Sequence, residues 1–229
     1  RDECPLALVI RLLDEFNQLN AEWVMLSGGE PCLRQDLAEI LAETMRRGFR
    51  TQLITSASLL PDSVLQVLKE HKVPVQVTLD SVDPAVFFLS RGRPNLPIIL
   101  YNIDRMLEAG IDLNIAVTLT SVTEKTIRQT IEWTVAKGIH NMHFSPVIPE
   151  GRGKWNQSLV PQHLTKDWLL LYQLQKEYCD TLSIDLVEDL VTSTVFPGSS
   201  IASFCNAMSG RNLEISADGT VYSCGGMRD

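Results

Sequence analysis

A five-residue turn, Ser27 to Pro31, carries the residues most suited to chemistry in this chain. It reads Ser-Gly-Gly-Glu-Pro and follows the apolar run Trp23 to Leu26, which is typical of a buried strand. A helix-like stretch begins at Leu33. Two glycines at a strand-to-helix turn let the backbone come close to a ligand, and the Glu30 carboxylate beside them accepts hydrogen bonds. The turn is therefore predicted to bind a ligand.

A repeated alternation of helix and strand patterns positions this turn. Apolar residues recur at helical spacing and then give way to short strand-like runs five times in succession, at 22–27, 49–55, 73–80, 112–118 and 141–145. Such regularity predicts parallel strands joined by helical crossovers, in either an open doubly wound sheet or a (β/α) barrel. In both architectures ligands bind at the C-terminal ends of the strands, which is where the turn lies.

Composition excludes several classes of function. The 229 residues carry 20 Lys and Arg against 28 Asp and Glu, a formal net charge of -8, and no basic run is longer than Arg46-Arg47. We therefore expect no nucleic-acid partner, and the lack of a long apolar segment or signal peptide predicts a cytoplasmic protein without a membrane span. The five cysteines are an odd, scattered set that favours reduced thiols or metal ligands over disulfides.

The pattern changes after Pro146. We expect three parts: a partial barrel at 1–150, a connecting loop and helix at 151–200, and a separate C-terminal piece at 201–229. In the last part, Ala217-Asp218-Gly219 lies between two strand-like runs, 213–216 and 220–223, which predicts a hairpin. Cys205 precedes this hairpin and Cys224 follows it.

With the Gly-Gly-Glu-Pro run at the end of an early strand, the chain resembles the radical S-adenosylmethionine (radical SAM) superfamily. The segment from Thr55 to Leu60 is similar to the family's third-strand segment, although Ser56-Ala57 replaces its usual Asn-Gly. Leu79-Asp80-Ser81, followed by Arg91-Gly92, is similar to the fourth-strand segment, and Gly151-Arg152-Gly153 matches a common loop. The resemblance implies an α/β fold, a partial (β/α)6 TIM-like barrel whose first strand is missing.

The resemblance also implies ligands for S-adenosylmethionine. The glycine turn would approach the amino group of the methionine moiety, and an arginine would meet its carboxylate. Three further residues at strand ends are weaker candidates for the ribose or carboxylate. The implied cofactor-binding residues are Gly28, Gly29, Glu30, Pro31, Ser56, Thr78, Asp80 and Arg91.

The tail resembles the opening of a SPASM domain, in which cysteines bind auxiliary iron–sulfur clusters. Thirteen residues separate Cys205 from Gly219, and four separate Gly219 from Cys224, a spacing typical of that opening. Thiolates on both sides of a hairpin suit iron–sulfur ligation, because the turn brings distant ligands together. The resemblance therefore implies Cys205 and Cys224 as metal ligands.

One family feature is missing: the C-x-x-x-C-x-x-C triplet that holds three irons of the 4Fe–4S cluster. Cys4 has no other cysteine within eight positions and cannot replace it. Either the chain is a fragment whose first strand and cluster loop are removed or disordered, or the protein has lost radical chemistry. We favour a fragment, because a degenerate protein would be expected to keep a strand whose loss exposes a sheet edge.

The implied function is that of a radical SAM/SPASM iron–sulfur oxidoreductase or maturase. It would cleave S-adenosylmethionine reductively to a 5′-deoxyadenosyl radical, which abstracts hydrogen from a substrate. A peptide or protein side chain is the leading substrate, in peptide maturation or cofactor biosynthesis, with flavodoxin or ferredoxin as electron donor. One alternative is a non-catalytic, cluster-less barrel that binds a peptide or nucleotide-like ligand. Another is an unrelated aldolase or isomerase barrel, which the absence of Lys at predicted strand ends disfavours.

Several other polar residues are given structural roles. Cys32 and Cys179 lack partners at ligand spacing, so neither is assigned a function. His143 in the last predicted strand is expected to be a hydrogen-bonded histidine rather than a catalytic one. The acidic group that includes Asp185 and Glu188 is expected to form a solvated face, although one of its carboxylates could act as a base toward a substrate radical.

Overall fold

A single parallel sheet organises the computed structural model, which describes residues 3–147, 157–161, 163–186 and 212–223. Its six strands lie in the order β1-β2-β3-β4-β5-β6, and each pairs in parallel with the next. The sheet stays open, with β1 and β6 as its outer strands. The strands are β1 (Trp23–Leu26), β2 (Arg50–Thr55), β3 (Val75–Thr78), β4 (Leu113–Leu119), β5 (Asn141–Pro146) and β6 (Ser183–Leu186).

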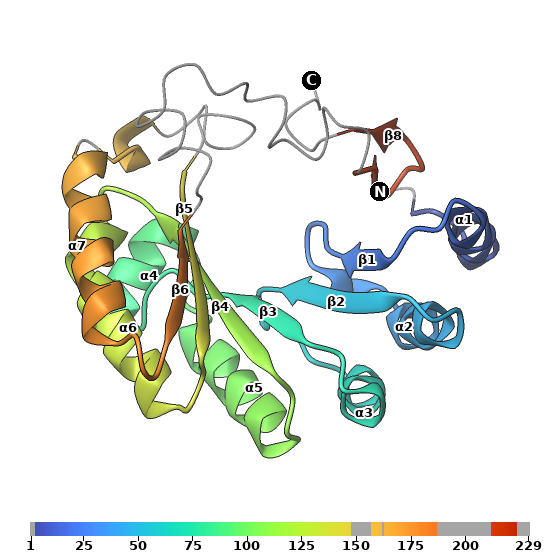
Figure 1. Ribbon diagram of the computed structural model, residues 1–229, viewed down its shortest axis with the longest axis horizontal. Helices are drawn as coiled ribbons and strands as arrows, with labels where there is room; N and C mark the ends of the chain where they lie inside the picture. The colour runs from blue at the N-terminus through green and yellow to red at the C-terminus, as the bar shows by residue number, and fades with distance from the viewer. Residues whose placement is uncertain (1–2, 148–156, 162, 187–211, 224–229) are drawn as a thin grey trace.

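Helices lie around the outer side of the sheet (Figure 1). This arrangement is the partial barrel that the resemblance implied. The α-helices are α1 (Leu6–Gln18), α2 (Leu37–Arg46), α3 (Asp62–His71), α4 (Pro84–Arg91), α5 (Leu96–Glu108), α6 (Ile127–Ala136) and α7 (Leu164–Glu177). The described residues also form three short 3-10 helices: η1 (Pro31–Leu33), η2 (Thr123–Thr126) and η4 (Gln157–Leu159).

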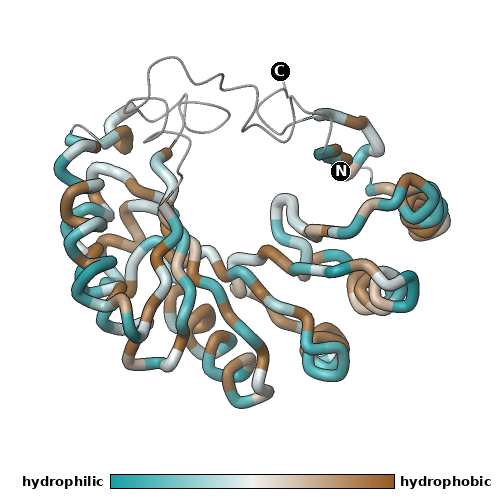
Figure 2. The backbone as a smooth tube through the Cα atoms, viewed as in Figure 1, coloured by the Kyte–Doolittle hydropathy of each residue, from teal (hydrophilic) through white to brown (hydrophobic). Residues whose placement is uncertain are grey.

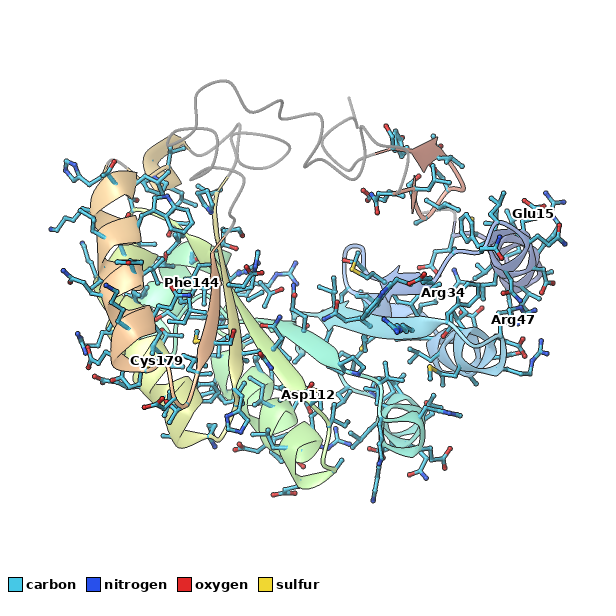
Figure 3. All side chains as sticks on the ribbon, viewed as in Figure 1. Glu15, Arg34, Arg47, Asp112, Phe144 and Cys179 are labelled. Carbon is cyan, nitrogen blue, oxygen red and sulfur yellow. The ribbon has the colours of Figure 1, made fainter. Side chains whose placement is uncertain are left out.

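The core lies between the sheet and these helices. Along β2, β3 and β5, buried residues alternate with more exposed ones, because successive side chains point to opposite faces of a sheet. Leu53, Val77 and Phe144 are fully buried, and Figure 3 places Phe144 between the sheet and α7. Figure 2 shows the same alternation as hydrophobic and hydrophilic colours along the strands. The opposite face, which the helices leave uncovered, is called the inner face below.

Two elements were not predicted from the sequence. Helix α4 occupies the segment between Asp80 and Gly92, where Asp83 caps its first turn by accepting hydrogen bonds from two backbone amides. Strand β6 extends the sheet beyond β5, within the range expected only to connect two parts of the chain. The five predicted strands are all present, at boundaries close to those expected.

The predicted hairpin is confirmed and lies against the start of the chain. Strand β7 (Glu214–Ile215) pairs antiparallel with β8 (Val221–Tyr222), and Gly219 turns the chain with a φ of +88°. The Cys4 amide donates a hydrogen bond of 2.6 Å to the Ala217 carbonyl. Figure 1 accordingly shows the hairpin beside the N-terminal end of α1. In the part of the chain that the structure describes, no helix has the length and apolar character to cross a bilayer.

A buried asparagine supports the loop that follows β2. The Asn102 side chain on α5 is 3% exposed and donates a hydrogen bond of 2.9 Å to the carbonyl of Ala57, whose φ is +54°. Asn102→Ala leaves that carbonyl without its donor, so we expect a loss of about 1–3 kcal/mol in unfolding free energy. Urea unfolding measures it, with Gln66→Ala on the exposed face of α3 as the control. Equal losses in the two variants would contradict the assigned support.

Candidate functional site

The turn after β1 presents an open stretch of backbone. Gly28 has a φ of +140°, a conformation that residues with a side chain rarely adopt. A Cβ built on Gly28 or Gly29 would meet no described atom within 4 Å. The backbone of both glycines is therefore accessible to a ligand, and Pro31 then opens η1 and turns the chain away.

The Glu30 carboxylate ties this turn to the end of β2. Its Oε1 accepts hydrogen bonds from the Thr55 hydroxyl at 2.5 Å and from the Cys32 amide at 3.2 Å. Its Oε2 accepts from the Ser56 amide at 2.9 Å and also from the Ser56 hydroxyl. A carboxylate has about four acceptor positions, so these donors fill them. Glu30 thus holds two strand ends together, and a ligand ammonium would have to share or displace one of the donors.

Asp80 and Arg91 were predicted separately, and the structure joins them. The Asp80 side chain is 2% exposed, and its two oxygens accept from Arg91 Nε at 2.6 Å and Nη2 at 2.7 Å. It also accepts from the Ser90 hydroxyl at 2.5 Å and from the Thr118 amide at 3.1 Å. Asp80 is saturated by protein donors, whereas Arg91 keeps N–H groups for a ligand carboxylate.

Ser56 and Thr78 are the predicted strand-end residues that remain to be placed. Ser56 belongs to the Glu30 cluster through its amide and hydroxyl. Thr78 ends β3, partly exposed on the inner face, and its hydroxyl makes no hydrogen bond within the described residues. It lies two residues before Asp80, at the same edge of the sheet. The sequence prediction therefore placed its candidate residues at one end of the sheet, as the structure does.

Two site residues were missed by the sequence analysis. Thr55 bonds to Glu30, and Ser90 bonds to Asp80. Both are immediate neighbours of predicted residues, Ser56 and Arg91. The signal in the sequence was a polar side chain next to a predicted site residue. Only the positions of the strands and of α4 show which of these polar neighbours reach Glu30 or Asp80.

The described cysteines do not form a metal site. Cys4 and Cys32 are buried, Cys179 is exposed, and within the described ranges no three His, Cys, Asp or Glu side chains gather to hold a metal. The described cysteines therefore do not fit a 4Fe–4S cluster. Cys205 and Cys224, the predicted ligands of an auxiliary cluster, lie outside the described residues.

Cys32 is expected to resist alkylation. Burial and the neighbouring Glu30 charge raise the pKa of this thiol from 9.0 to about 12, so it stays protonated at pH 9, where a thiolate is needed for reaction. We expect iodoacetamide at pH 9 to label the exposed Cys179 about 100-fold faster than Cys32 in the folded protein. Mass spectrometry of the digested protein measures this, with urea-unfolded protein as the control. Comparable labelling before unfolding would refute the burial argument.

The two clusters fit the methionine end of S-adenosylmethionine. That end carries an ammonium and a carboxylate. Open backbone carbonyls at Gly28 and Gly29 can accept from the ammonium, and the free N–H groups of Arg91 can donate to the carboxylate. The saturated carboxylates of Glu30 and Asp80 fix these partners in place.

Curated proteins of known activity resemble the chain at low identity. An AdoMet-dependent heme synthase from Methanosarcina barkeri is 26% identical over 167 residues, covering 72% of this chain and 48% of the relative. The mitochondrial GTP 3′,8-cyclase of Arabidopsis thaliana is 26% identical over 227 residues, covering 94% of this chain and 57% of the relative. The chain spans about half the length of the curated relatives it matches.

Solved structures confirm the fold. Streptococcus suis SuiB bound to S-adenosylmethionine matches with a TM-score of 0.80 at 18% identity, covering 100% of this chain and 56% of SuiB. Native anSMEcpe with bound AdoMet matches with a TM-score of 0.71 at 19% identity, covering 97% of this chain and 65% of that protein. The family profile described as the Radical SAM superfamily matches residues 3–134, more than half of the sequence. The chain therefore belongs to the radical SAM superfamily.

Proposed function

We propose that the whole protein is a radical SAM enzyme and that this chain holds the methionine end of its S-adenosylmethionine. The observation that carries the proposal is the pair of saturated carboxylates at one end of the sheet, which leave the glycine backbone and Arg91 free for a ligand. Bound S-adenosylmethionine supplies, on reductive cleavage, the 5′-deoxyadenosyl radical that removes a hydrogen atom from the substrate. The chain's own residues bind and orient the cofactor.

For the substrate we favour a peptide or protein side chain. The support is that SuiB is known in a structure bound to its precursor peptide SuiA and anSMEcpe in one with a peptide, both at the level of fold. A nucleotide is the second candidate, because several curated relatives are named GTP 3′,8-cyclase. Cys205 and Cys224 are proposed as ligands of an auxiliary iron–sulfur cluster, and flavodoxin or ferredoxin as the electron donor.

The test uses the full-length protein, reconstituted anaerobically with iron and sulfide. We expect a bound 4Fe–4S cluster, binding of S-adenosylmethionine, and dithionite-dependent formation of 5′-deoxyadenosine. A full-length protein without a cluster would rule out the radical proposal. Adding a pool of proteome-derived peptides or GTP then separates the substrate classes: peptides should increase 5′-deoxyadenosine formation, and a response to GTP alone would favour the nucleotide.

A further inference from the structure

The inner face of the sheet is polar beyond the cofactor site. Strand register places Thr78 of β3 level with Ala116 of β4, Ala116 level with His143 of β5, and His143 level with Asp185 of β6. Alternation then assigns these residues to the inner face, because Phe144 and Ile184 next to them are buried against the helices. These four inner-face positions form a row that runs from Thr78, in the cofactor half of the sheet, to Asp185 on β6.

His143 and Asp185 form a fixed pair at the end of this row. Nδ1 of His143 lies 3.1 Å from Oδ2 of Asp185, with side-chain exposures of 28% and 69%. A carboxylate can only accept, so the hydrogen bond places a proton on Nδ1. In the neutral imidazole, Nε2 is then an acceptor, and within the described residues it has no hydrogen-bond partner.

A second acceptor lies on the same face, closer to the N-terminal end of β4. The Oδ1 atom of Asn114 is buried and has no hydrogen-bond partner among the described residues. Asn114 precedes Ala116 by two positions on the strand beside β5, which places it within about 8 Å of His143 from the spacings of a parallel sheet. An unpaired buried acceptor calls for a donor.

The charge around these acceptors favours a donor with positive charge. Ala116, between Thr78 and His143, is 8% exposed and contributes only a methyl group to the row. Asp185 has no Lys or Arg partner in the described part of the chain. The region therefore offers acceptors and an unneutralised carboxylate.

We propose that His143, Asp185 and Asn114 form a substrate subsite that binds a primary ammonium group, such as a lysine side chain or the N-terminus of a peptide. Asp185 holds His143 in the tautomer whose Nε2 accepts, and it supplies the complementary charge. Asn114 Oδ1 accepts a further N–H. The subsite deepens the proposed function and rests on it, because it names the chemical group that a peptide substrate would present beside the cofactor.

The test titrates full-length protein, labelled with ¹⁵N-histidine, with n-butylammonium as the probe. We expect a saturable chemical-shift change at His143 and none at His140, whose Nδ1 bonds instead to the Thr181 carbonyl. Asp185→Asn should weaken the binding about fivefold or more, since it removes the charge while keeping the shape. Asp14→Asn, the same change on the exposed face of α1, is the matched control and should leave the binding unchanged.

The result of the butylammonium titration either supports or overturns the proposed subsite. Saturable binding that Asp185→Asn weakens supports the subsite. Absence of a saturable shift at His143, equal binding in the Asp185 variant, or binding of butyrate in place of butylammonium would overturn it. A parallel titration with S-adenosylmethionine keeps the two proposals separate: failure with butylammonium alone removes the subsite, whereas failure to bind S-adenosylmethionine removes the proposed function. An unchanged His140 signal shows that each variant is folded.

Discussion

Glu30→Gln is expected to weaken S-adenosylmethionine binding by about 30-fold, equivalent to about 2 kcal/mol, and to loosen the end of β2. The glutamate accepts from four protein donors, and a glutamine has only one oxygen with which to replace its two. In either orientation of the glutamine side-chain amide, its NH₂ group faces one of the protein donors that the carboxylate had accepted from. The Ser56 amide or the Thr55 hydroxyl then loses its acceptor, and the glycine turn loses its attachment to β2.

Two measurements separate this role from that of a direct ligand. Isothermal titration on full-length protein gives the dissociation constant for S-adenosylmethionine, and hydrogen exchange gives the protection of the Ser56 amide. We expect both to change in Glu30→Gln. Glu39→Gln makes the same chemical change on the exposed face of α2 and should alter neither. Weaker binding with full protection at Ser56 would show that Glu30 acts only as a ligand and not as a positioning residue.

Much of the fold follows from local sequence patterns. The helical periodicity and the glycines after the helices predicted the five strands from β1 to β5, because each crossover must bury one face and stop before the next strand. Helix α4 was missed although Asp83, Pro84 and Gly92 mark its two ends, since its eight residues show little periodicity between them. Strand β6 was missed because Ser183 and Asp185 interrupt a four-residue run that only pairing with β5 identifies as a strand.

The site was predictable as a set of residues but not as a set of contacts. Position at strand ends indicated Glu30 and Asp80, since parallel strands gather their ends at one edge, whereas the family resemblance alone selected Arg91, which ends α4. Their pairing depends on register: Leu26 lies level with Leu53, so Glu30 and Ser56, which follow them by four and three residues, meet. Asp80 and Arg91 meet only because α4 returns the chain to the end of β3.

The pair of His143 and Asp185 illustrates the same limit. Taken singly, a histidine in a strand and an acidic residue after a helix were assigned ordinary structural roles. Their juxtaposition requires β6, which the sequence pattern did not predict, to lie beside β5 with these residues level. The assignment of His143 as a hydrogen-bonded histidine is confirmed by its contact with Asp185. Its proposed role in binding a substrate comes from the acceptor that this contact leaves free.

Asp80→Asn is expected to cost about 3 kcal/mol of stability, which corresponds to a fall of roughly 6–12 °C in Tm. Asp80 is buried and accepts from Nε and Nη2 of Arg91, from the Ser90 hydroxyl and from the Thr118 amide. An asparagine keeps one acceptor oxygen and turns an NH₂ group toward a donor. The guanidinium, released from its fixed orientation, should then bind the cofactor carboxylate about tenfold more weakly, a loss of about 1.4 kcal/mol.

A surface pair in the same chain supplies the matched control for this change. Arg128 makes two hydrogen bonds to Glu177, at 2.8 and 3.0 Å, but both side chains are about half exposed. Water replaces much of what such a pair provides, so Glu177→Gln should lower stability far less than Asp80→Asn does and leave cofactor binding unchanged. Thermal unfolding and titration with S-adenosylmethionine measure both variants.

A double-mutant cycle then assigns the Asp80 effect to its partner. Arg91→Met removes the charge and the fork while keeping an unbranched apolar side chain. If Asp80 acts mainly by orienting Arg91, Asp80→Asn should weaken cofactor binding in the wild-type background and have little further effect in the Arg91→Met background. Additive effects would instead mean that Asp80 reaches the cofactor independently of Arg91. The coupling energy for binding therefore decides whether this buried carboxylate is a positioning residue or a ligand, whatever the two variants cost in stability.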